Sequence, residues 1–110
     1  MPHDTMELIT FKVTGVVQGV SFRYYTQREA LSLGLRGWCH NHPDESVEGV
    51  AVGDKDEIAQ FTKYLHRGPK YAQVAHVDVV KVAQPSEAQI AEAMGEGSGD
   101  RQFEIRRWRG

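Results

Sequence analysis

The stretch from Gly15 to Tyr25 carries the residue types best suited to chemistry, with two glycines and an arginine between a strand pattern and a helix pattern. Backbone N–H groups at the start of a helix have no intrahelical partner, and the helix dipole makes that end positive. Gly15 and Gly19 permit positive φ and close approach of a ligand to the backbone. Arg23 adds a planar fork of donors that grips two phosphate oxygens. The stretch predicts an anion site, although an ordinary turn followed by a solvated arginine would have the same sequence.

Two segments resemble the signatures of one known family. Residues 15–23, Gly-Val-Val-Gln-Gly-Val-Ser-Phe-Arg, are similar to the first signature of the acylphosphatases, and residues 37–41, Gly-Trp-Cys-His-Asn, are similar to the second. The similarity continues through 47–53, 65–69 and 103–106, so it covers nearly the whole chain.

The resemblance implies a metal-independent hydrolase that splits acyl phosphates, small-molecule substrates, into carboxylate and phosphate. It gives Arg23 the role of phosphate clamp and Asn41 the role of orienting the attacking water. The phosphate cradle would be formed by the backbone amides of Val17, Gln18, Gly19, Val20, Ser21 and Phe22.

These roles suit the chemistry, because a carboxylate leaving group is weakly basic and needs little help from a general acid. Catalysis can then rest on positioning the phosphoryl group and stabilising its charge. The Asn41 amide offers both an acceptor and donors while staying neutral beside an anion. One residue departs from the family pattern: Glu45 stands where acylphosphatases often have glycine. Since other residues rarely adopt positive φ, we expect a different turn there.

Alternating apolar residues and turn signals predict five strands and two main helices. The helices are expected to start near Phe22 and at an Asp54 N-cap that pairs with Glu57, and to end at Gly34 and Gly68. The strands are expected at 8–13, 35–40, 47–52, 72–82 and 102–108. The second and third strands should form a hairpin. In the fourth strand the valines change parity between Val79 and Val80, which indicates either a bulge or a strand covered on both faces.

This order predicts an α+β, ferredoxin-like two-layer sandwich, βαββαβ with an additional C-terminal strand, and two helices on one face of a mainly antiparallel sheet. We expect a single domain over residues 1–110, with a flexible N-terminus at 1–6 and a long surface connection at 84–100. That connection includes a helix-capable piece at 86–94.

Composition narrows the class of protein. A net charge of −2 over 110 residues argues against nucleic acid as a partner. The single cysteine, Cys39, fits a buried position and a reducing compartment. The chain shows neither a leader pattern nor an apolar run long enough to span a bilayer, so we expect a cytoplasmic protein without membrane contact, and a monomer.

Other interpretations of the site residues remain open. His40, His42, Asp44 and His76 could be imagined as metal ligands, but their spacing matches no established zinc pattern, so solvated or edge histidines and no metal or other cofactor are expected. The C-terminal group Arg106, Arg107, Trp108 and Arg109 could bind an acidic partner, although a solvated terminus is favoured. A non-catalytic module that binds phosphate or carbamoyl phosphate would share this fold. RNA binding would need exposed aromatic residues on the strands, and residues 47–52 have none.

Overall fold

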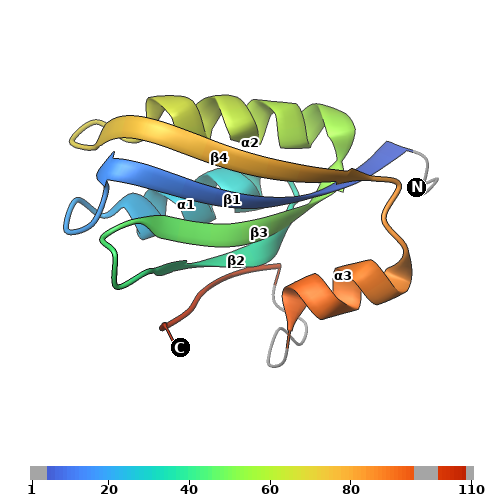
Figure 1. Cartoon of the computed structure of the whole chain (residues 1–110). Coiled ribbons are helices and arrows are strands. Elements are labelled where there is room, and N and C mark those ends of the chain that lie inside the picture. The colour runs from blue at the N-terminus through green and yellow to red at the C-terminus, as the bar shows by residue number, and fades with distance from the viewer. Residues whose placement is uncertain (1–4, 96–101, 109–110) are drawn as a thin grey trace.

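The computed structural model describes residues 5–95 and 102–108 of the chain. Figure 1 shows a twisted sheet with two helices behind it and a third, shorter helix on the opposite side. The elements are β1 (Met6–Val16), α1 (Phe22–Ser32), β2 (Arg36–Asn41), β3 (Val47–Asp54), α2 (Lys55–Arg67), β4 (Gln73–Ala83), α3 (Glu87–Met94) and β5 (Phe103–Ile105). The strand order is β4-β1-β3-β2-β5, with β5 parallel to β2 and the other pairs antiparallel. The predicted ferredoxin-like sandwich with an added strand is confirmed.

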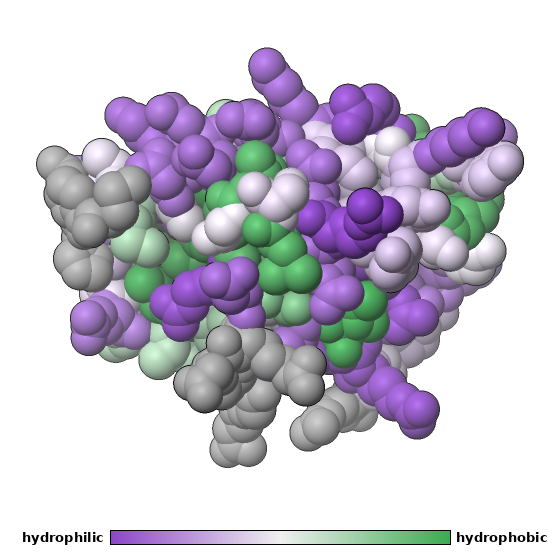
Figure 2. All heavy atoms as spheres, turned by 180° about the vertical axis from the view of Figure 1, so that it is seen from behind, coloured by the Kyte–Doolittle hydropathy of each residue, from purple (hydrophilic) through white to green (hydrophobic). Residues whose placement is uncertain are grey.

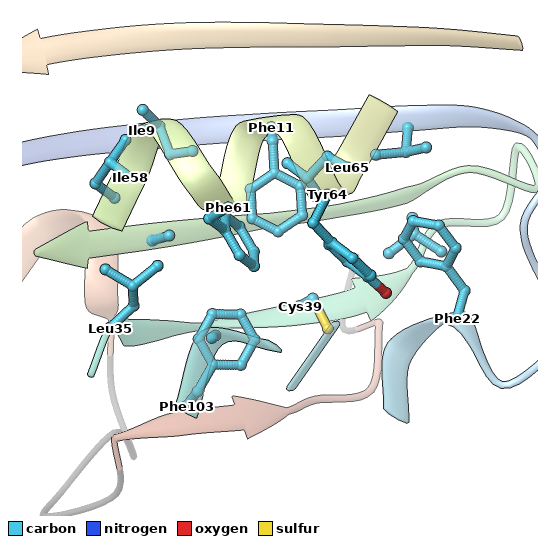
Figure 3. Close-up of a cluster of buried hydrophobic side chains, with 14 of the residues drawn as sticks. Ile9, Phe11, Phe22, Leu35, Cys39, Ile58, Phe61, Tyr64, Leu65 and Phe103 are labelled. Atoms are coloured by element: carbon cyan, nitrogen blue, oxygen red, sulfur yellow. The ribbon is translucent and has the colours of Figure 1, made fainter. Parts of the chain in front are cut away.

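The main core lies between the sheet and the pair α1 and α2. Alternate residues of β1 point into it, because Ile9, Phe11 and Val13 are buried while the residues between them face the other side of the sheet. The Phe11 and Phe61 rings meet edge to face with centroids 5.5 Å apart, which joins β1 to α2 (Figure 3). The outer side of the helix layer is mainly hydrophilic, with smaller hydrophobic areas between the polar residues (Figure 2).

Helix ends follow the local sequence. Asp54 caps α2 by accepting a hydrogen bond from the Asp56 N–H at 3.1 Å. Gly34 and Gly68 adopt φ of 72° and 70°, the left-handed backbone that commonly ends a helix. Both predicted helix ends are therefore confirmed.

The second face of the sheet is partly covered by α3. A capping box joins Ser86 and Gln89 at its start, and Ile90 and Met94 are buried against residues of β1 and β3. Val82 packs on the same cluster, whereas Val79 packs on the main core. Val80 is 66% exposed, however, so the alternative of a strand covered on both faces holds only at the Val82 end of β4, where the second face is partly covered. The bulge alternative is wrong at Val79 and Val80, where the register is regular; a register shift lies instead at Thr14 and Gly15.

The helix-capable piece at 86–94 forms α3, and the rest of the predicted 84–100 connection lies outside the described residues from 96 onward. Residues 1–4 of the predicted flexible N-terminus also lie outside them. No helix in residues 5–95 or 102–108 is long and apolar enough to cross a membrane.

The C-terminal segment is shorter as a strand than predicted and packs more closely. Strand pairing with β2 covers Phe103 to Ile105, and the Arg106 N–H still donates to the Cys39 carbonyl at 2.8 Å. The Arg106 side chain donates to the Met94 carbonyl at 2.8 Å and lies over the Trp38 ring. Trp108 contacts the His42 ring, with centroids 4.3 Å apart. We expected a solvated terminus, and this is wrong for Arg106, whose side chain is packed. Trp108 is half-exposed, so the expectation is partly met there. Arg109 lies outside the described residues.

Candidate active site

A pocket of about 360 Å³ lies where the turn after β1 meets the end of β2. Three separate parts of the chain build it, namely the turn with the first residues of α1, the last residue of β2, and β5. Its lining residues are Val17, Gly19, Ser21, Phe22, Arg23, Tyr24, Asn41 and Ile105. The fold thus brings Arg23 and Asn41, 18 positions apart in the sequence, into one pocket.

The start of α1 has the features of an anion cradle. Gly19 and Ser21 both adopt left-handed backbone, with φ of 76° and 59°. Ser21 occupies the N-cap position but makes no side-chain cap hydrogen bond, so it leaves the first N–H groups of the helix to another acceptor. The first turn of α1 contains no acidic residue to repel a phosphate. Backbone and charge therefore both favour an anion at this helix end.

The two glycines of the turn have different structural roles. A Cβ on Gly15 would lie 2.1 Å from the Gln73 carbonyl oxygen, so Gly15 permits the close approach of β4 at the register shift. A Cβ on Gly19 would meet nothing within 4 Å, so there it is the positive φ that requires glycine. Gly15 does not line the pocket, so it does not let a ligand approach the backbone as expected. Its role is to allow close packing of β1 against β4.

Asn41 stands at the end of β2, opposite Val47 of β3. Its Oδ1 atom is buried and has no hydrogen-bond partner within the described part of the chain. Buried polar atoms are nearly always paired, so an unpaired acceptor in a pocket indicates a group that a ligand or water satisfies. This geometry suits the predicted water-orienting role.

Gln18 reaches away from the pocket and fastens the turn to the hairpin. Its Nε2 group donates to the carbonyl oxygens of His42 and Ser46, each at 2.9 Å. Because His42 directly follows Asn41, these bonds fix the cradle relative to the end of β2. No local sequence signal predicts the contact, since the partners are 24 and 28 positions away.

Of the residues whose amides were predicted to form the cradle, four line the pocket: Val17, Gly19, Ser21 and Phe22. Gln18 and Val20 do not line it, and Val20 packs on the main core. Tyr24 and Ile105 line it without having been predicted to do so. Phe103 of the same strand is buried, whereas Ile105 is exposed.

A sequence model of the acylphosphatase family matches residues 9–92. The chain belongs to the acylphosphatase family. The acylphosphatase of Nocardioides sp. is 47% identical over 76 residues, which cover 69% of this chain and 77% of that one.

Solved structures agree with this assignment. The acylphosphatase of Coxiella burnetii superposes with a TM-score of 0.74 at 30% identity, over 93% of this chain and 94% of that one. HypF of T. kodakarensis contains a similar unit, with a TM-score of 0.69 at 26% identity, over 94% of this chain but only 12% of the longer protein.

Cys39 lies behind the acylphosphatase pocket and takes no part in its chemistry. Burial raises the pKa of its thiol to about 12, and the positive charge of Arg23 opposes this shift without cancelling it. The residue therefore stays a neutral, buried thiol, as its position within a strand predicts.

The hairpin after Asn41 is held by an ionic network. The Lys12 ammonium and the Ser46 hydroxyl and N–H bind the Asp44 carboxylate, with Lys12 making the largest contribution, and together they hold the pKa of that carboxyl well below its usual range. The His42 ring approaches the same carboxylate, with Nδ1 2.9 Å from Oδ1. Asp44 thereby links the hairpin loop to β1.

Glu45 adopts φ of 75°, so the loop beside Asn41 keeps a left-handed backbone although this acylphosphatase has glutamate there. The expectation that a glutamate would avoid this conformation is wrong. The ionic network around the neighbouring Asp44 and the hydrogen bond from the His42 N–H to the Ser46 carbonyl hold the loop closed around it.

Replacing Glu45 by glycine is expected to raise the free energy of unfolding by about 0.5–1 kcal/mol. Relief of left-handed strain contributes about 1–2 kcal/mol, and the greater chain entropy of glycine offsets about 0.5–1 kcal/mol of it. Urea unfolding of Glu45→Gly measures the change. Glu45→Ala is the matched control, because it removes the charge but keeps the Cβ and the strain. A Glu45→Gly protein no more stable than Glu45→Ala would contradict the prediction.

His40 and His76, which do not line the pocket, are each paired with a carboxylate. His40 meets Glu48 at 2.8 Å, and His76 meets Asp78 at 2.9 Å. His40 is buried between Trp38 and Trp108, so the expectation of a solvated or edge histidine is wrong for it. Within residues 5–95 and 102–108, no group of three or more His, Cys, Asp or Glu residues is arranged to hold a metal ion.

Proposed function

We propose that this acylphosphatase hydrolyses the carboxyl–phosphate bond of acyl phosphates, with Arg23 and the backbone amides of residues 17–22 holding the phosphate and Asn41 orienting the attacking water. The observation that carries the proposal is the shared pocket, lined both by Arg23 in the first turn of α1 and by Asn41, whose buried Oδ1 has no hydrogen-bond partner among the described residues. One group binds the anion and the other accepts a hydrogen bond from water.

The reaction proceeds by in-line displacement. The water oxygen forms a bond to phosphorus as the bond between phosphorus and the acyl oxygen breaks, and the carboxylate leaves with that electron pair. The proton of the water passes to a phosphate oxygen, because none of the described lining residues is a carboxylate or an imidazole that could take it. Arg23 and the cradle amides stabilise the charge on the equatorial oxygens throughout.

The chain works as a cytoplasmic monomer in this proposal, and it takes a small-molecule substrate. A mass of 12.4 kDa by light scattering at working concentration would agree with a monomer. The mass of a dimer would contradict the monomer but would leave the proposed reaction unaffected.

The deciding experiment is hydrolysis of benzoyl phosphate by the purified protein, followed by ultraviolet absorbance in the presence of EDTA. Turnover well above the uncatalysed rate and insensitive to the chelator is expected, because the proposed groups need no metal. Isothermal titration with inorganic phosphate runs beside it. Phosphate binding without turnover would overturn hydrolysis and favour a regulatory module instead.

A further inference from the structure

The phosphate-holding groups occupy only part of the pocket, and the remainder of its lining is apolar. Arg23, Asn41 and the backbone at Gly19 and Ser21 form its polar part. The leaving group departs from the opposite side of phosphorus to the attacking water. The acyl group must therefore lie against whatever surface flanks the mouth of the pocket.

Only two apolar lining residues have surface to offer there. Val17 and Phe22 are each 1% exposed, because their side chains belong to the main core. Tyr24 is 50% exposed and Ile105 is 39% exposed, although both line the pocket. A half-exposed aromatic ring and a branched aliphatic side chain gain from covering by an apolar group.

Tyr24 contacts its neighbours on α1 through its ring, and the backbone of Ile105 is fixed by pairing with β2. The Tyr24 ring meets the Tyr25 ring edge to face at 5.2 Å, and the Arg28 guanidinium lies 5.8 Å from the Tyr24 ring centroid. Ile105 pairs with Cys39 across the parallel β2 and β5 ladder, and the Arg106 N–H donates to the Cys39 carbonyl at 2.8 Å. The backbone that carries the two side chains is therefore fixed before a ligand binds, which lowers the cost of ordering the surface.

We propose that Tyr24 and Ile105 form the acyl-group subsite and that they make the protein prefer acyl phosphates with an aromatic or bulky apolar acyl group over acetyl phosphate. This inference rests on the proposed function, since it names the substrate class of the same site. The described lining residues include no carboxylate. Their neutral polar side-chain groups are the Ser21 and Tyr24 hydroxyls and the Asn41 amide, and no other such group could hydrogen-bond to a polar acyl group. The preference of the protein among acyl phosphates therefore depends on apolar contact between the acyl group and the side chains of Tyr24 and Ile105.

The test compares kcat/KM for benzoyl phosphate and acetyl phosphate in the intact protein and its variants. Tyr24→Ala is expected to lower the benzoyl to acetyl ratio about tenfold, the size of effect of a lost apolar contact in a specificity pocket. Tyr24→Phe keeps the ring and should keep the ratio, whereas Ile105→Ala should lower it. Tyr71→Ala is the matched control, because Tyr71 is an exposed tyrosine that does not line the pocket.

The inhibition constant of inorganic phosphate reports whether the cradle is intact in each variant, so a folding defect is distinguished from a lost subsite. A lower ratio with unchanged phosphate inhibition supports the subsite. An unchanged ratio in Tyr24→Ala, or a ratio that falls equally in Tyr24→Phe, overturns it while hydrolysis by the unmodified protein still stands. If the unmodified protein hydrolyses neither compound, the proposed function fails and the subsite fails with it.

Discussion

Asn41→Ala is expected to lower kcat for acyl phosphate hydrolysis by about 10² to 10³ while leaving the affinity for inorganic phosphate nearly unchanged. The magnitude is that of losing one well-placed polar group in a pre-organised site. The physical reason is that alanine cannot accept a hydrogen bond from the attacking water, whereas the phosphate is held by groups on the other side of the pocket. Steady-state kinetics with benzoyl phosphate, together with phosphate titration, measure both quantities.

Asn41→Ala should also cost little stability. The Asn41 Oδ1 atom is buried without a partner in the described part of the chain, so its removal loses no hydrogen bond and relieves an unpaired acceptor. Gln60→Ala serves as the control, because Gln60 is an exposed amide on α2 and should leave turnover unchanged. An Asn41→Ala protein with full activity would end the water-orienting role; one with weakened phosphate binding would place Asn41 in the cradle instead.

Arg23→Gln is expected to damage binding and turnover together, lowering kcat/KM by about 10³ or more. The guanidinium makes charge-assisted hydrogen bonds, which are about twice as strong as neutral ones, and its contribution grows as negative charge spreads over the equatorial oxygens. Glutamine keeps the length of the side chain but loses the charge and the fork. Both kcat/KM and the inhibition constant of inorganic phosphate should worsen, in contrast to Asn41→Ala.

Two comparisons sharpen the test of Arg23. Arg23→Lys keeps the charge without the planar fork, so partial recovery of phosphate binding with poor turnover would separate charge from geometry. Arg67→Gln makes the same change on an exposed residue of α2 and should have no effect on kcat/KM. If Arg23→Gln bound inorganic phosphate as tightly as the unmodified protein, the clamp would have to be assigned to the backbone amides alone.

The candidate site was only partly predictable. Arg23, Asn41 and the turn at 17–22 were singled out because they lie in two short segments that resemble the acylphosphatase signatures, and Arg23 and Asn41 do line one pocket. Tyr24 and Ile105 were not identified, since nothing local distinguishes a tyrosine in a first helical turn, or an isoleucine in a strand, as part of a pocket. The contact of Gln18 with the hairpin was missed for the same reason.

The sequence by itself determined the elements and their order. Alternation of apolar residues along β1, the Asp54 cap and the Gly34 and Gly68 ends all act within a few residues, so they could be recognised without knowing the fold. The connectivity then left the ferredoxin-like sandwich as the simple way to bury both helices on one sheet face.

Only the tertiary structure decided what distant segments do to one another. It placed α3 on the second face of the sheet, bonded the Arg106 side chain to the Met94 carbonyl, and buried His40 beside Trp38 and Trp108. It also kept Glu45 in a left-handed conformation against its own preference. The reason is common to all four: the free energy of these arrangements comes from contacts between residues far apart in the chain, and such contacts override local propensity without leaving a local pattern.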